Sequence, residues 1–175
     1  MCHLHHHPPH TLCLTEHHPH HDELAPLHIE NYTFGAYYCR KSKHKGDFCM
    51  FVHNSIKFTL NIDSYYLDQD FEVCAIHRNS VYDKLCILAI YRSPLGNFNT
   101  FLTNFDLILQ KFFNPKFNLI LCGDINVNYL VESYKKNQLV NILQSFHLSS
   151  IVSSPTRLGP NSFSTIDNVF IDNSY

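Results

Sequence analysis

Apolar and polar positions follow two different periods along this chain, and the periods divide it into expected strands and helices. Short apolar or alternating runs predict strands over residues 11–15, 31–40, 48–52, 71–78, 84–91, 117–122, 148–152 and 164–171. Apolar residues at i, i+3, i+4 and i+7 predict amphipathic helices over residues 98–112 and 133–146. Hairpins followed by strand–helix–strand–helix imply a mixed α/β fold whose sheets are largely buried.

The most informative stretch is 117–128, where an apolar run ends at Gly123 and polar residues follow. An apolar run of this kind predicts a buried strand. If the chain stays extended after Gly123, residues two apart share a face, so Asp124 and Asn126 would point into one space. The alternative is a turn after a core strand, in which Asx side chains bond nearby backbone. The spacing alone favours the turn and leaves both interpretations open.

Composition limits the classes of protein to be considered. The chain has 175 residues, 45% hydrophobic and 16% charged, which indicates a globular domain and excludes a disordered chain. A net charge of -2 gives no overall basic field, so a polyanion would have to be held by local groups or a metal. Seven cysteines without a C-x-x-C pair indicate free thiols in a reducing compartment. No run is long enough to cross a bilayer and no signal peptide is found, so we expect an intracellular protein.

The first ten residues are rich in His and Pro and have no apolar face, so we expect a disordered leader over residues 1–10 and one domain over 11–175. Histidines crowd this front part without a fixed spacing, which does not predict a specific metal site. A basic segment, residues 40–45, could contact phosphates, although the sequence alone favours a plain solvated loop.

Four features stand in order along the sequence: Glu16 at the end of a predicted strand, Tyr91-Arg92-Ser93-Pro94, Gly123-Asp124-Ile125-Asn126 and Thr165-Ile166-Asp167-Asn168. Together they resemble the endonuclease/exonuclease/phosphatase superfamily, in particular the endonuclease domain of LINE-type (non-LTR) retrotransposons. The resemblance runs from about Leu12 to Phe170. It implies a four-layer α/β sandwich, incomplete here, with mixed and mostly antiparallel sheets flanked by helices.

The resemblance also implies the chemistry of the site, which is hydrolysis of a DNA phosphodiester with Mg²⁺ (or Mn²⁺). Glu16 and Asp167 would be the metal ligands, which suits a hard cation that prefers carboxylate oxygens. Tyr91 would contact the scissile phosphate, Asp124 would position or deprotonate the attacking water, and Asn126 would bind the phosphate. Asp167 also belongs to the implied catalytic set. Arg92 and Thr165 would lie against the substrate backbone.

The sequence departs from this family at both ends. A strand that carries an asparagine ahead of the metal glutamate, and a last strand with Ser-Asp-His, are not found between Met1 and Tyr175. We therefore expect an incomplete site with little or no catalysis. Two alternatives stay open: a non-catalytic remnant that binds nucleic acid or metal, and a phosphatase of the same superfamily. We expect DNA as the partner, a monomer with no membrane contact, and the nucleus as the compartment that the family's target indicates.

Overall fold

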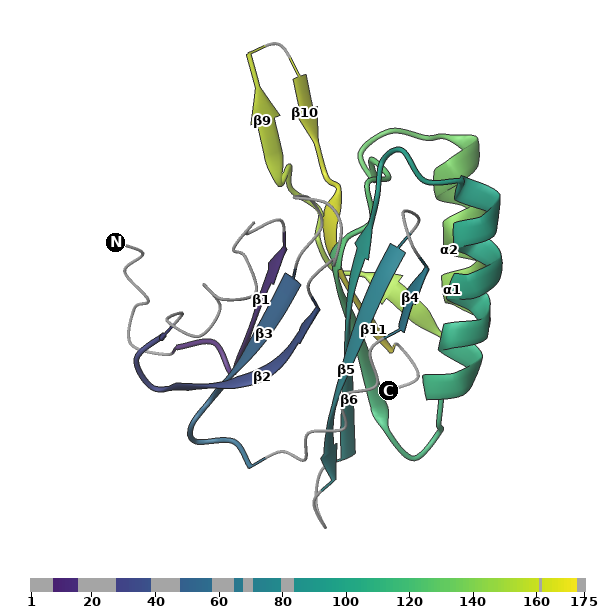
Figure 1. The fold of residues 1–175 in the computed structure, drawn as a ribbon. Helices are drawn as coiled ribbons and strands as arrows, with labels where there is room; N and C mark the ends of the chain where they lie inside the picture. Colours follow the sequence, from purple (N-terminus) through teal and green to yellow (C-terminus); the bar gives the residue numbers. More distant parts are fainter. Residues whose placement is uncertain are drawn as a thin grey trace.

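The computed structural model describes residues 8–15, 28–38, 48–57, 65–67, 71–79, 84–160 and 162–172. Its body consists of two β-sheets and two helices, and a small two-stranded sheet projects from it (Figure 1). The proposed metal ligand Glu16, the basic segment 40–45 and the first seven residues of the expected leader lie outside the described residues.

The smaller body sheet has the antiparallel order β1-β3-β2. Its strands are β1 (Thr11–Thr15), β2 (Tyr32–Tyr38) and β3 (Phe48–His53). The expected pairing of the second and third of these strands is confirmed. The His53 N–H donates to the His10 carbonyl at 2.9 Å, and the Tyr32 hydroxyl donates to the Pro9 carbonyl at 2.6 Å. These bonds hold residues 9 and 10 against the sheet.

The larger sheet has the order β4-β5-β6-β7-β11-β8. Its strands are β4 (Tyr65–Leu67), β5 (Phe71–Asn79), β6 (Lys84–Arg92), β7 (Asn118–Asp124), β8 (Leu148–Ser150) and β11 (Asp167–Asp172). Strands β6 and β7 run parallel, and the other pairs described in this sheet run antiparallel. The expectation of mixed, mostly antiparallel sheets is confirmed.

Both expected helices are present, as α1 (Phe98–Phe112) and α2 (Tyr134–Ser145). The side chains of Asn97 and Ser133 cap their first turns by accepting backbone N–H bonds. The apolar stripe of α1, which includes Phe101 and Phe105, packs in the main core against the larger sheet. Burial of one such side chain stabilises the fold by about 1.5–3 kcal/mol. Within the described residues, neither helix has the length and apolar character needed to cross a membrane.

The elements form layers, with the β1-β3-β2 sheet on one face of the larger sheet and the helices on the other (Figure 1). A second apolar cluster, which includes Met50, Val52, Cys74 and Ile76, lies between the two sheets. The described part of the chain therefore shows three of the four layers that the resemblance implies. No helix among the described residues covers the outer face of the β1-β3-β2 sheet.

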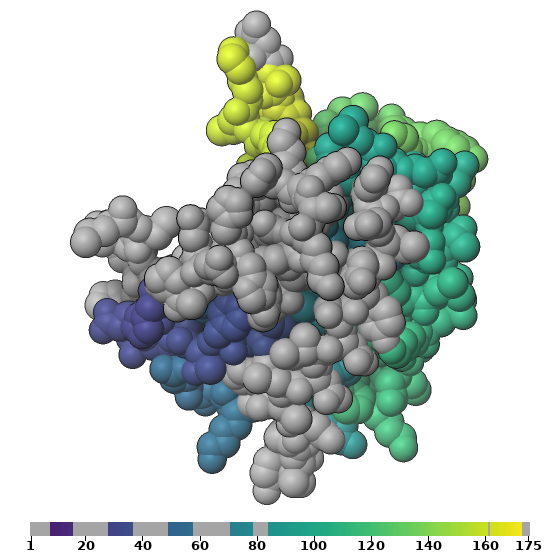
Figure 2. All heavy atoms as spheres, viewed as in Figure 1, coloured from purple at the N-terminus to yellow at the C-terminus, as the bar shows by residue number. Residues whose placement is uncertain are grey.

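A projecting hairpin corrects one sequence expectation. No strand was predicted over residues 153–163, but β9 (Arg157–Gly159) pairs antiparallel with β10 (Ser162–Ser164). Figures 1 and 2 show this hairpin standing out from the body. Leu158 and Phe163 are 80% and 65% exposed on it. The last long strand begins at Asp167 and not at residue 164, because the chain belongs to the hairpin up to Ser164.

Candidate active site

Three residues proposed for catalysis lie in one row across neighbouring strands. Tyr91 on β6 pairs in register with Asp124 on β7, and Asp124 pairs in register with Asp167 on β11. Side chains at paired positions of neighbouring strands point to the same face of a sheet. Two residues before Asp124, Cys122 packs into the cluster between the two sheets. The row therefore lies on the sheet face that looks toward β1, at the ends of β6 and β7.

Glu72 extends this row by one strand, since it pairs in register with Tyr91. Its side chain is 1% exposed, and its neighbours Phe71 and Val73 face the helices instead. The sequence analysis did not single out Glu72. The available signal was a carboxylate inside an otherwise apolar strand, because a buried acid of this kind has a high desolvation cost unless polar groups surround it.

The turn after β7 is an Asx turn, which confirms the interpretation that the spacing favoured over an extended strand. The backbone N–H of Asn126 donates to Oδ1 of Asp124 at 2.9 Å, and Asn126 has a φ of 52°. Glycine is needed at position 123 for the chain to enter this turn. Its φ is 135°, and the Cβ of any other residue would lie 1.9 Å from the Ile90 carbonyl oxygen. Asp124 is 1% exposed and is held by the backbone of the turn that follows it.

Arg92 is placed beneath the site and not on its surface, which corrects its expected contact with substrate. Its side chain is 1% exposed on the helix side of the sheet. Its guanidinium donates to the carbonyls of Ile125, Asn126 and Gly96 at 3.4–3.5 Å. Its Cζ also lies 5.1 Å from the ring centroid of Phe98. Arg92 therefore holds the loop after β6 and the loop after β7 in place through these bonds.

Thr165 is also internal, with no exposed surface and with its hydroxyl bonded inside the protein, so an expected contact with the substrate backbone does not fit this position. Its hydroxyl donates to the Ser154 carbonyl at 2.8 Å. Its N–H donates to Oδ1 of Asn128 at 3.1 Å, and its carbonyl accepts from Tyr129 at 2.9 Å. Asn128, which the sequence analysis also missed, thereby joins the turn after β7 to the segment that leads into Asp167.

Thr156 positions the segment next to Asp167. Its Oγ1 accepts backbone N–H bonds from Ile166 at 3.2 Å and from Asp167 at 3.3 Å. The sequence analysis predicted no strand or helix at Thr156 and gave it no function. The loop before the hairpin thus fixes the backbone that presents the Asp167 carboxylate.

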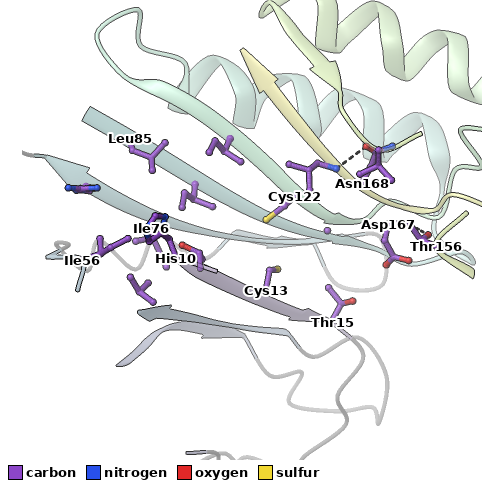
Figure 3. A pocket seen from close by; sticks show the side chains of 18 residues that line it. His10, Cys13, Thr15, Ile56, Ile76, Leu85, Cys122, Thr156, Asp167 and Asn168 are labelled. Atoms are coloured by element: carbon purple, nitrogen blue, oxygen red, sulfur yellow. Dashed lines mark hydrogen bonds between the residues drawn. The ribbon is translucent and has the colours of Figure 1, made fainter. Parts of the chain in front are cut away.

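A cavity of about 740 Å³ lies between the two sheets and is lined by residues from both. Figure 3 shows Thr15, at the end of β1, across from Asp167 and Thr156 at one end of this cavity. The donors that face this end are oxygens, which fits a hard divalent cation. Glu16 follows Thr15 directly in the sequence, and the described residues contain no group of three His, Cys, Asp or Glu side chains that could hold a metal ion. In the described part, Asp167 is accordingly the candidate carboxylate ligand.

The comparisons with known proteins agree with this architecture. The family model described as endonuclease–reverse transcriptase matches residues 85–175. No curated protein matches the sequence significantly. Among solved structures, the endonuclease domain of TRAS1, a telomere-specific non-LTR retrotransposon, aligns with a TM-score of 0.59 at 16% identity, over 83% of this chain and 68% of that one.

Two other structures share the fold at similarly low identity. D. rerio TDP2 complexed with a single-strand DNA product gives a TM-score of 0.65 at 14% identity, over 94% of this chain and 71% of that one. The Bacteroides thetaiotaomicron mannosyl-6-phosphatase gives 0.58 at 14% identity, over 83% of this chain and 64% of that one. The family match covers more than half of the sequence, and the chain therefore belongs to the endonuclease–reverse transcriptase family of the endonuclease/exonuclease/phosphatase superfamily.

Proposed function

We propose that this chain carries the site of a Mg²⁺-dependent (or Mn²⁺-dependent) DNA endonuclease of the non-LTR retrotransposon type. The observation that carries the proposal is the register that brings Tyr91, Asp124 and Asp167 side by side on neighbouring strands, with Asp167 lining one end of the cavity between the sheets. A phenol and two carboxylates in one row can serve phosphodiester hydrolysis, since one acid can bind a cation while the other accepts a proton.

Each side chain has a distinct part in the proposed reaction. Asp167, with Glu16, would hold the cation, which when bound neutralises charge on the phosphoryl oxygens. Asp124 would orient the attacking water and take its proton, because the Asn126 N–H fixes its Oδ1. The Tyr91 hydroxyl would donate to a phosphoryl oxygen. The water oxygen forms a new bond to phosphorus as the bond from phosphorus to the leaving oxygen breaks.

The turn would act as a single positioned unit. Asn126 donates its side-chain N–H to the Arg92 carbonyl at 2.8 Å. The proposed contact of Asn126 with phosphate therefore has to use the second N–H of its side-chain amide. Arg92 and Thr165 would influence the reaction only through the loops that they hold.

The projecting hairpin favours nucleic acid over a small phosphate ester as substrate. It leads from Thr156 out and back to Thr165, so its base belongs to the site. It carries exposed Leu158 and Phe163 together with the exposed cation Arg157. Apolar side chains on a projecting ribbon can enter a nucleic-acid groove while a nearby cation contacts phosphate.

A plasmid-nicking assay with Mg²⁺ tests the proposal, with the chain compared with Asp124→Ala. We expect slow conversion of supercoiled to open-circular DNA by the chain, and its loss in the variant and in EDTA. Asp106→Asn serves as the matched control, because Asp106 lies on α1 and bonds Gln110. Nicking that persists in Asp124→Ala at the rate of the chain itself would contradict the assigned role.

The alternatives give different results in the same experiment. Release of inorganic phosphate from a sugar phosphate without nicking would indicate the phosphatase, a class whose fold the chain shares. Salt-dependent DNA binding without nicking would indicate a non-catalytic remnant. Phe163→Ala separates these outcomes further, since it should weaken DNA binding and leave sugar-phosphate hydrolysis unchanged.

A further inference from the structure

Two cysteines from different sheets meet in the cavity between the sheets. Cys13 lies on β1 and Cys122 lies on β7, and both line this cavity. Figure 3 shows their sulfur atoms directed toward each other across the gap. The two side chains are hydrogen-bonded to each other. No backbone pairing connects β1 with β7, so these thiols form a side-chain contact between separate layers.

Exposure distinguishes this pair from the other cysteines that the structure describes. Cys13 and Cys122 are partly exposed, whereas Cys49, Cys74 and Cys86 have no exposed surface. Burial raises the pKa of Cys74 and of Cys86 from 9.0 to about 12, which keeps both as unreactive thiols. In contrast, the hydrogen bond from Cys13 lowers the pKa of Cys122. The reactive species is the thiolate, so the first oxidation should occur at Cys122.

We propose that Cys13 and Cys122 are a redox-sensitive modification site that closes into a disulfide between β1 and β7 when a peroxide is present. The Cys122 thiolate attacks one oxygen of hydrogen peroxide and the O–O bond breaks, so that this oxygen forms the sulfenic acid and the other leaves as hydroxide. The Cys13 thiol then attacks the sulfenic sulfur, the new S–S bond forms, and water leaves. The two thiols lose two electrons in total, and the peroxide accepts them.

The bond would act on the site that lies two residues beyond each cysteine. Thr15 follows Cys13 at the end of β1, and Asp124 follows Cys122 at the end of β7. A disulfide holds its two sulfur atoms at about 2.05 Å, closer than any hydrogen-bonded pair of thiols, so it draws these strand ends together. The consequence for activity rests on the proposed function, but the cross-link does not.

Peptide mass spectrometry of the full chain after peroxide treatment tests the cross-link directly. Trypsin releases Cys122 in peptide 117–135 as its only cysteine, and releases Cys13 in peptide 1–40 together with Cys2 and Cys39. We expect these two peptides to be joined, with a mass lower by two hydrogen atoms than their sum, and dithiothreitol to separate them. Fragment spectra of the joined species should place the link at Cys13.

Variants in the same peptides provide the control. Cys13→Ser and Cys122→Ser should each abolish the link, whereas Cys2→Ser and Cys39→Ser should retain it. Oxidation that leaves peptides 1–40 and 117–135 unlinked in the unmodified chain would overturn the proposal without relying on any variant.

Activity and stability report on the consequence of the bond. The linked chain should melt at a higher temperature than the reduced chain, because the link constrains the unfolded state. It should also lose nicking activity until dithiothreitol is added. Linked chain that nicks at the reduced rate would overturn the effect on the site. A chain that links but never nicks would contradict the proposed function and leave the modification site supported.

Discussion

Arg92 and Asn126 bind each other in both directions across the ends of β6 and β7. The side-chain amide of Asn126 donates to the Arg92 carbonyl at 2.8 Å, and the Arg92 guanidinium donates to the Asn126 carbonyl at 3.5 Å. The backbone of the same turn holds Asp124. These two bonds therefore make the position of the proposed catalytic carboxylate depend on the buried Arg92 guanidinium.

Replacing Arg92 should therefore affect both stability and catalysis. In Arg92→Met, three carbonyls lose their donors inside the fold, and we expect the free energy of unfolding to fall by about 3 kcal/mol. Arg92→Lys should lose less, since it keeps the charge but not the planar fork. Urea denaturation measures both. Arg157→Met, on the exposed hairpin, is the control and should change stability by less than about 0.5 kcal/mol.

Kinetics separate this effect from simple unfolding. At a temperature where Arg92→Lys is fully folded, its nicking should show a lower kcat with a nearly unchanged KM, because the residue positions the turn without touching substrate. A raised KM with an unchanged kcat would instead indicate a direct substrate contact.

Gly123→Ala should be among the most damaging single substitutions in the larger sheet. The added Cβ would lie 1.9 Å from the Ile90 carbonyl oxygen, and the φ of 135° is one that alanine rarely adopts. We expect a loss of at least about 3 kcal/mol in unfolding free energy. In Gly159→Ala the nearest atom is the Ser162 hydroxyl oxygen at 2.7 Å, on a side chain that can rotate, so this control should lose less than about 1 kcal/mol. Equal losses would mean that the close approach at Gly123 does not control the turn.

Thr165→Val tests the internal place assigned to this residue. The isosteric change removes the hydroxyl that donates to the Ser154 carbonyl, and leaves that carbonyl without its donor inside the chain. We expect a loss of about 1–3 kcal/mol, with Thr165→Ser close to the original stability. If the valine variant kept its stability but bound DNA more weakly, Thr165 would contact the substrate, against the internal place assigned to it.

The parts of this fold that follow from periodicity were accessible from the sequence. The apolar stripe of residues 98–112 predicted both ends of α1 correctly. Only a helix places all of these apolar side chains on one face, and that face is buried. Motifs in the sequence identified Tyr91, Asp124 and Asp167, but their alignment in one row depends on the register of the strands. Register arises from long-range pairing of β6, β7 and β11, which no local pattern contains.

The parts that were missed or left open depend on local backbone geometry and on single buried polar groups. The turn at Asn126 was favoured but left open, because an Asp side chain that accepts its N–H gives a left-handed turn that alternation cannot distinguish from an extended strand. Arg92 was expected to lie against the substrate because the resemblance implied it. Arginine is rarely buried, but here backbone carbonyls and aromatic rings satisfy its guanidinium. The hairpin was missed because strands of three residues are too short to show a period.

The buried thiols of Cys74 and Cys86 predict how stability depends on pH. Burial raises the pKa of each from 9.0 to about 12. Below pH 9 both thiols are protonated in the folded and the unfolded chain, so their contribution to stability is fully present. Between pH 9 and 12 the unfolded chain loses these protons while the folded chain keeps them. The free energy of unfolding should therefore fall by up to about 1.4 kcal/mol per pH unit for each thiol.

Urea denaturation of the reduced chain between pH 8 and 11 measures this slope, and replacement of the thiols identifies its source. Cys74→Ala with Cys86→Ala should lower stability at pH 8, because both side chains are buried, yet should make the decline above pH 9 shallower. Val131→Ala changes an exposed side chain that does not titrate and should leave the slope as it is in the unchanged chain. The difference between the two slopes isolates the two thiols from every group that both chains retain. If the unfolding free energy of the double variant fell as steeply as that of the parent, other groups would set the alkaline limit.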